Sequence, residues 1–287
     1  MGISTLQMAL ISLIPSLAIC VFVYIKDRKE KEPLWLLALL FALSAVIYIP
    51  LYYLCGLINS GFAGAFSSEF SKNLATGMTV WSSTGSKASY LLLTSFIGTA
   101  LIEEIARWLI LYFVTVRSKY FDCLFDGVVY SVFVSMGAAV TRSVIIAFES
   151  GWELFLLKLL SSFPWYLFFG IVMGILYTSW HTKRSANEKE NRMIKDGILK
   201  KDRIRYPAFS LVSSILIPVL IHGFYSFVTA LRAPGYNLLF GIVIALMMCV
   251  CIVLIIVFSK KDKTKREAID EMIKTYHKGG EGEIEDA

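Results

Sequence analysis

Two adjacent glutamates, Glu103 and Glu104, lie inside a long apolar stretch, and Arg107 follows them in the same stretch. A histidine, His222, lies inside another apolar stretch much later in the chain. Ionisable side chains are costly in hydrocarbon, so those that persist usually face a bundle interior or a wet cavity and serve a function. Two carboxylates and an imidazole can ligate a metal ion or activate a water molecule. These four residues are therefore our candidates for chemistry.

The candidate residues lie at similar depths. Glu103 comes thirteen residues after Tyr90, and His222 comes nine residues before Leu231, which at about 1.5 Å per residue is roughly 20 Å and 14 Å below the same surface. Adjacent helical positions point about 100° apart, so we expect Glu103 and Glu104 to do different jobs. Arg107 follows them at i+4 and i+3 and can neutralise either. That spacing also fits a structural ion pair, so both interpretations stay open.

The elements that must position these residues are membrane-spanning helices. The chain has 287 residues, is 56% hydrophobic and has a mean hydropathy of +0.65, values that exclude an ordinary soluble domain. A span needs about 20 mostly apolar residues. Seven stretches meet this length, and we predict an all-α polytopic bundle over residues 1–258. The predicted spans are Ile3–Ile25, Leu34–Leu57, Tyr90–Val116, Phe125–Phe148, Leu154–Trp180, Phe209–Leu231 and Leu238–Phe258.

The distribution of basic residues predicts the orientation of this bundle. Of the 28 Lys and Arg residues, 22 fall on one set of alternating connections and 3 on the other set. Because cytoplasmic connections are rich in Lys and Arg, we predict the N-terminus outside and the C-terminus inside. Residues 181–207 are then a basic cytoplasmic loop, and residues 259–287 are a cytoplasmic tail. The basic residues follow the membrane topology, so we expect membrane lipids as partners and no nucleic acid.

Smaller signals concern packing and the ends of spans. Gly127, Ser131 and Ser135 recur every four residues, and Gly170 and Gly174 form a G-x-x-x-G pattern, which together predict close approach of two helices. Asp126 and Lys158 lie near span ends, where we expect them to reach the headgroups. In the tail, an apolar stripe that includes Ile269, Met272 and Ile273 predicts a short interfacial helix. The five cysteines form no C-x-x-C pattern and suggest no disulfide framework.

Four motifs, taken in order, resemble the PrsW family of intramembrane proteases over residues 27 to about 230. They are Asp27–Pro33 (DRKEKEP), Glu103–Arg107 (EEIAR), Phe125–Tyr130 (FDGVVY) and His222–Phe227 (HGFYSF). The resemblance implies a multi-pass protease of the bacterial cytoplasmic membrane, metal-dependent or glutamate-type. Its substrate would be a single-span membrane-anchored regulator, such as an anti-sigma factor.

The resemblance also implies which residues do the work. Glu103, Glu104, His222 and Arg107 match the catalytic positions, and the first three would be the metal ligands if a metal such as zinc were bound. Where the family carries a Glu-Asn pair, this chain has Arg142 and Ser143, and Trp165 stands at a position where the family has histidine. A metal site needs about three protein ligands and an open position, and Arg142 would bring a cation where a metal wants an anion.

Three functional hypotheses follow from these residues. The first is an intramembrane endopeptidase that uses a glutamate as general base, with or without a metal. The second is a catalytically inactive relative that binds membrane partners, in which Arg142 neutralises a glutamate and Trp165 fills the former ligand position. A third is a transporter that couples to protons or ions through the glutamates, although we find neither an internal repeat nor a pair of broken helices.

Overall fold

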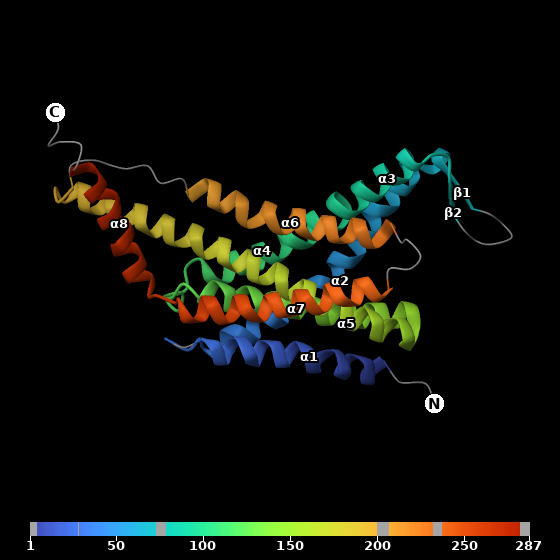
Figure 1. Ribbon diagram of the computed structural model, residues 1–287, viewed down its shortest axis with the longest axis horizontal. Helices are drawn as coiled ribbons and strands as arrows, with labels where there is room; N and C mark the ends of the chain where they lie inside the picture. The colour runs from blue at the N-terminus through green and yellow to red at the C-terminus, as the bar shows by residue number, and fades with distance from the viewer. Residues whose placement is uncertain (1–4, 28, 73–78, 200–206, 232–236, 282–287) are drawn as a thin grey trace.

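The computed structural model describes residues 5–27, 29–72, 79–199, 207–231 and 237–281, and this part of the chain is almost wholly helical (Figure 1). A small antiparallel hairpin pairs Phe70 with Trp81. This hairpin lies at one end of the long bundle, and the last helix lies at the other end (Figure 1). The helices are α1 (Thr5–Lys26), α2 (Leu34–Ala65), α3 (Thr84–Leu92), α4 (Ile102–Thr115), α5 (Asp126–Lys195), α6 (Pro207–Leu231), α7 (Asn237–Lys260) and α8 (Lys265–Glu281), with the 3-10 turn η1 (Ser67–Glu69), the π-helical segment η2 (Leu93–Leu101) and the strands β1 (Phe70–Lys72) and β2 (Thr79–Trp81).

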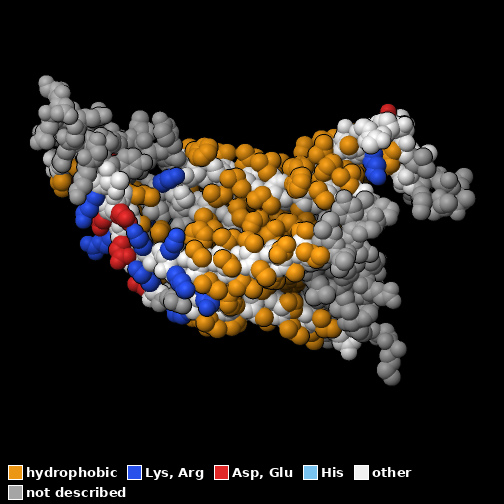
Figure 2. Space-filling model, viewed as in Figure 1, with side chains coloured by type: hydrophobic (Ala, Val, Ile, Leu, Met, Phe, Trp, Pro, Cys, Tyr) orange, Lys and Arg blue, Asp and Glu red, His pale blue; other side chains and the backbone are white. Residues whose placement is uncertain are grey.

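The predicted helical membrane bundle is confirmed. Four helices within the described residues are long and apolar enough to cross a membrane: Leu34–Ala65, Asp126–Glu149, Ser162–Lys195 and Ala208–Leu231. Leu10–Lys26 and Ala245–Lys260 are shorter apolar helices, and the predicted span Tyr90–Val116 is built from α3, η2 and α4 in succession. The count of seven spans and the orientation stay predictions. Figure 2 shows hydrophobic side chains over the middle of the bundle, with Lys and Arg gathered at the end where α8 lies.

Helix α5 folds back on itself and forms the centre of the bundle. The Ser131 hydroxyl donates a hydrogen bond to the Gly170 carbonyl at 2.7 Å, so the chain must reverse between Glu149 and Ser162. A Cβ on Gly174 would overlap Ser131 and the Gly127 backbone. The close approach that we predicted from the small residues is therefore confirmed. Helices α1, α2, α6 and α7 pack around this helical hairpin.

We expect Gly174→Ala to destabilise the bundle by about 1–3 kcal/mol, because an added methyl group at a closed contact must push the two halves of α5 apart. Gly61→Ala is the matched control, since a Cβ at this helical glycine meets nothing within 4 Å. Thermal unfolding in detergent micelles measures both variants. Equal unfolding temperatures for the two variants would contradict the close contact.

Three features at the α8 end differ from what the sequence pattern suggested. Helix α5 continues to Lys195, so most of the predicted loop 181–207 is helical, while 200–206 lie outside the described residues. The short helix that the apolar stripe predicted is α8, and its Ile269 and Ile273 pack against Ala186 of α5. Asp126 does not reach the headgroups, because it is fully buried under the α4–α5 connection. The Lys158 side chain lies outside the described part of the chain.

Candidate active site

The glutamate pair lies in the first turn of α4, directly after the π-helical segment η2. Both side chains are buried, with Glu103 at 2% and Glu104 at 0% exposure. Their contacts differ as the helical geometry predicted: Glu103 faces α2 and α5, and Glu104 faces α6. The two carboxylates therefore belong to two separate polar clusters.

Glu103 has partners on both of its carboxylate oxygens. Oε1 accepts hydrogen bonds from the Tyr48 hydroxyl and from Arg142 Nη1, each at 2.8 Å. Oε2 accepts a hydrogen bond from the Tyr166 hydroxyl, also at 2.8 Å. Arg142 Nη1 also donates to the Tyr48 hydroxyl at 2.9 Å. Glu103 is thus an ion-paired carboxylate that accepts a hydrogen bond on each oxygen.

Glu104 forms the second cluster with Arg107 and His222. Its Oε1 pairs with Arg107 Nη2 one turn along α4 and lies 2.8 Å from His222 Nδ1. Because an ionised carboxylate only accepts hydrogen bonds, Nδ1 is the donor in this contact. Phe169 stacks on the imidazole at a centroid distance of 4.6 Å, and the Arg107 guanidinium lies 4.9 Å from the Tyr166 ring centroid.

Several polar atoms of this second cluster still need partners. Glu104 Oε2 and the Nε and Nη1 atoms of Arg107 are buried and have no hydrogen-bond partner among the described residues. Trp165 stacks on Tyr225 at 4.4 Å, and its buried Nε1 also lacks a partner in the described part of the chain. Unpaired buried donors and acceptors are costly, so a water molecule or a peptide group would be favoured beside Glu104 and Arg107.

Two local features of the sequence bring α6 to the glutamates. Gly223 follows His222, and a Cβ there would overlap the Phe96 ring of η2, so only glycine allows α6 to approach so closely. The π-helical segment η2 carries Phe96 and ends one residue before α4. π-helical turns are rare and occur frequently at functional sites. The structure therefore brings Glu104, Arg107 and His222 together and places Glu103 in the neighbouring cluster with Tyr48, Tyr166 and Arg142.

Comparison with known proteins decides the relationship. The sequence model of one family, described as PrsW family intramembrane metalloprotease, matches residues 32–257. The chain belongs to the PrsW family. It is 27% identical to Protease PrsW of Oceanobacillus iheyensis over 214 residues, which cover 75% of this chain and 79% of that protein. It is 24% identical to Protease PrsW of Bacillus subtilis over 226 residues, or 78% and 84% of the two chains. No solved structure matches.

Membership of the PrsW family makes this chain a multi-pass bacterial membrane protein and supports an intramembrane protease. All four sequence motifs that resembled the family overlap or lie within the matched range, which begins at Glu32. The family relationship leaves the substrate and the roles of individual residues open. Those roles depend on the geometry of the two glutamate clusters.

The two glutamate clusters do not fit a resident zinc ion in this arrangement. Each carboxylate is ion-paired with a guanidinium, Glu103 with Arg142 and Glu104 with Arg107. Arg107 Nη2 also lies 3.4 Å from His222 Nδ1, so a cation already faces the single imidazole. A zinc site needs about three free ligands, and its positive charge would be repelled by two guanidinium groups.

Sequence reasoning missed the two tyrosines that bind Glu103. Tyr48 and Tyr166 are both buried and both donate to this carboxylate. Nothing in the sequence distinguishes them, because the chain has 14 tyrosines and many lie in apolar stretches. Arg142 carried a usable signal, since it is an ionisable residue in a span.

Proposed function

We propose that this protein is an intramembrane endopeptidase in which Glu104 activates water and Arg107 and His222 assist. The observation that carries the proposal is the unpaired Glu104 Oε2 beside unpaired N–H groups of Arg107, in a buried cluster. The Glu104 oxygen could accept a hydrogen bond from a water molecule, and an Arg107 N–H group could donate one to the carbonyl of a substrate. The substrate class that fits is a single-span membrane protein, such as an anti-sigma factor.

The proposed reaction balances in two steps. A water molecule gives a proton to Glu104 Oε2 while its oxygen attacks the scissile carbonyl carbon. The carbonyl oxygen becomes an oxyanion that accepts a hydrogen bond from Arg107 Nη1. Glu104 then passes the proton to the amide nitrogen as the C–N bond breaks, leaving a carboxyl group and an amine. His222 holds the Glu104 carboxylate in place through Nδ1–H.

Glu103 has a different role in this proposal. Both of its oxygens accept hydrogen bonds, from Tyr48, Tyr166 and Arg142, whereas Oε2 of Glu104 accepts none among the described residues, so Glu104 is the better base. It is a positioning residue that fixes the start of α4 against α2 and α5. The orientation of Glu104 toward α6 depends on that anchor.

A second candidate function is binding of a membrane partner without hydrolysis. Arg142 neutralises Glu103 at 2.8 Å, and Trp165 stacks on Tyr225 where the family resemblance placed a histidine. These two contacts are what loss of a metal site would leave behind. Both candidate functions involve binding of a single-span protein, but only the endopeptidase cleaves it.

Cleavage in water labelled with oxygen-18 tests the proposal directly. The purified protein is reconstituted in liposomes with a single-span substrate, and the products are analysed by mass spectrometry. Hydrolysis places one labelled oxygen in the new carboxyl group of the N-terminal product. Substrate that co-purifies with the protein but stays intact supports the second candidate and overturns the first.

We expect phenanthroline, a chelator that favours zinc over calcium and magnesium, to leave the cleavage rate unchanged. The reason is that the two guanidinium groups already neutralise the two carboxylates that zinc would need as ligands. The rate is measured in the liposome assay before and after dialysis against the chelator. A loss of cleavage that added zinc restores would show that the chain binds a catalytic metal in a different arrangement of these residues.

A further inference from the structure

Hydrogen bonds hold only one corner of the Arg107 guanidinium. Its Nη2 pairs with Glu104 Oε1 and lies 3.4 Å from His222 Nδ1. Its Nε and Nη1 atoms are buried and have no hydrogen-bond partner among the described residues. A planar guanidinium that is hydrogen-bonded through one nitrogen can still tilt, so its direction depends on what packs against its faces.

Two aromatic rings of α5 pack against this guanidinium. The Arg107 guanidinium carbon lies 4.9 Å from the ring centroid of Tyr166 and 5.8 Å from that of Phe169. The two rings come from positions i and i+3, which lie on one face of a helix, and the two residues are 3% and 0% exposed. Phe169 also stacks on the His222 imidazole at 4.6 Å. Because the attraction between a cation and a ring is stronger where water is excluded, these rings restrict the guanidinium.

The Tyr166 ring is itself fixed through its hydroxyl. This hydroxyl donates a hydrogen bond to Glu103 Oε2 at 2.8 Å and lies 3.3 Å from the Tyr48 hydroxyl. Phe169 has no hydroxyl and cannot be anchored in this way. Tyr166 therefore contacts the Glu103 cluster with its hydroxyl and Arg107 with its ring.

A buried tyrosine with a hydrogen-bonded hydroxyl is also an ordinary source of stability, and Tyr177 of the same helix is such a case. Tyr177 is 0% exposed, and its hydroxyl lies 2.9 Å from Thr115 Oγ1. Its ring contacts the rings of Trp108 and Trp180, with centroids 6.3 Å and 5.4 Å away. Tyr166 differs because its ring packs on the guanidinium of the proposed site.

We propose that Tyr166 is a positioning residue that aims the free N–H groups of Arg107 at the carbonyl oxygen of the substrate. Its hydroxyl is anchored on Glu103, and its ring fixes the tilt of the guanidinium that the pair with Glu104 leaves open. This role rests on the proposed function, because it requires Arg107 to stabilise the oxyanion. The Glu103 cluster then affects the reaction through Tyr166, without touching the substrate.

Such a role predicts a particular kinetic defect. The oxyanion forms only as water attacks, so a misaligned Arg107 weakens transition-state binding and leaves binding of the intact substrate unchanged. We expect Tyr166→Leu, which removes the ring, to lower kcat by about 10²-fold with little change in KM, because one oxyanion donor contributes about 10²–10³-fold. Tyr166→Phe keeps the ring and loses only the anchor, so it should lower kcat by less than about 10-fold.

A double-mutant cycle in the liposome cleavage assay separates positioning from general destabilisation. It compares Tyr166→Leu, Arg107→Gln and the variant that carries both substitutions. If Tyr166 acts through Arg107, the second substitution adds almost nothing to the loss of kcat caused by the first. Tyr177→Leu is the matched control, because it removes another buried tyrosine of α5 with a hydrogen-bonded hydroxyl. It should lower the unfolding temperature as Tyr166→Leu does and leave kcat unchanged.

Two failures can be told apart. If the wild type cleaves its substrate but the kcat losses multiply in the double variant, the positioning role is overturned and the proposed function stands. A rise in KM at unchanged kcat for Tyr166→Leu, or an equal kcat loss for Tyr177→Leu, overturns the positioning role in the same way. A wild type that binds the single-span substrate and leaves it intact overturns both. If circular dichroism shows that Tyr166→Leu does not fold, Tyr166→Phe completes the same cycle.

Discussion

Glu104→Gln should lower the cleavage rate by about 10²–10⁴-fold, the contribution typical of a general base, and leave the helices folded. Glutamine has nearly the same shape as glutamate, so the packing around α4 and α6 should persist. Its amide cannot take a proton from water, and it also weakens the 2.8 Å contact with His222. The rate is measured in liposomes with a single-span substrate, and circular dichroism reports the fold.

Glu103→Gln is the matched control for this experiment. It removes the same charge from the neighbouring position, whose two oxygens are already occupied by Tyr48, Tyr166 and Arg142. We expect a smaller loss of rate, accompanied by a lower unfolding temperature, because Arg142 loses its partner. If Glu103→Gln abolished cleavage and Glu104→Gln retained it, the two glutamates would have the opposite roles.

The second large effect concerns stability. Arg142→Gln should destabilise the protein by about 3 kcal/mol, because it leaves the Glu103 carboxylate buried without its cation. Breaking a buried pair costs about 3–5 kcal/mol, and the Arg142 side chain is 29% exposed, so we expect the lower end of this range. The free energy of unfolding is measured by denaturant titration in mixed micelles.

Two further variants distinguish the loss of stability caused by breaking the buried Glu103–Arg142 pair from the effect of removing any arginine. Glu103→Gln/Arg142→Gln removes both charges, and we expect it to recover most of the lost stability. Arg184→Gln breaks the Arg184–Glu188 pair, whose side chains are 46% and 51% exposed, and should cost less than about 1 kcal/mol. Equal losses for Arg142→Gln and Arg184→Gln would show that the Glu103 ion pair contributes little.

The sequence was sufficient for the helical bundle and for the cluster of ionisable groups. Long apolar stretches identify spans because hydrocarbon leaves few alternatives to a helix. Glu104 and His222 could be matched because residues at equal depth on neighbouring spans can meet, and they lie 2.8 Å apart. The small residues of α5 predicted a close helix contact that Gly170 and Ser131 form.

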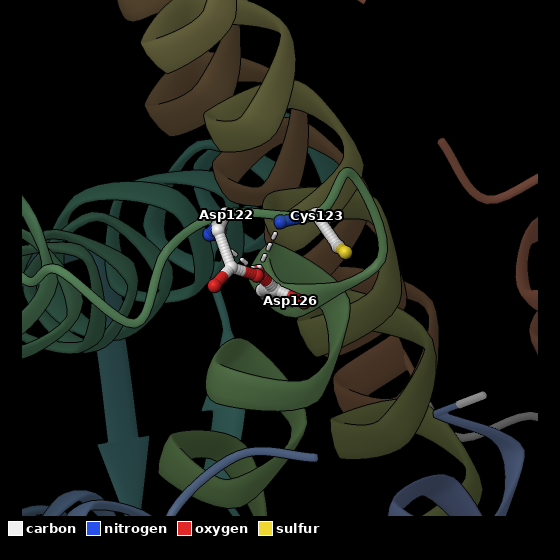
Figure 3. A group of neighbouring side chains, drawn as sticks. All are labelled: Asp122, Cys123 and Asp126. Atoms are coloured by element: carbon white, nitrogen blue, oxygen red, sulfur yellow. Dashed lines mark hydrogen bonds between the residues drawn. The ribbon is translucent and has the colours of Figure 1, made fainter. Parts of the chain in front are cut away.

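Other features depend on side-chain directions that a hydropathy pattern does not contain. Asp126 was expected to reach the headgroups, but it turns toward the α4–α5 connection and accepts hydrogen bonds from the amides of Asp122 and Cys123 (Figure 3). The apolar stripe of α8 predicted a helix correctly and its partner wrongly, because α5 extends far enough to cover Ile269. The π-helical turns of η2 have no sequence signature beyond ordinary span residues.

The pairing of each glutamate with its own arginine has an electrical consequence. Glu103 with Arg142, and Glu104 with Arg107, give the centre of the bundle no net charge while His222 is neutral. A membrane potential of 100 mV changes the energy of one elementary charge that crosses the whole bilayer by about 2.3 kcal/mol. Two balanced ion pairs carry no net charge, so the same potential changes their energy very little. The membrane potential should therefore not by itself rearrange these two ion pairs.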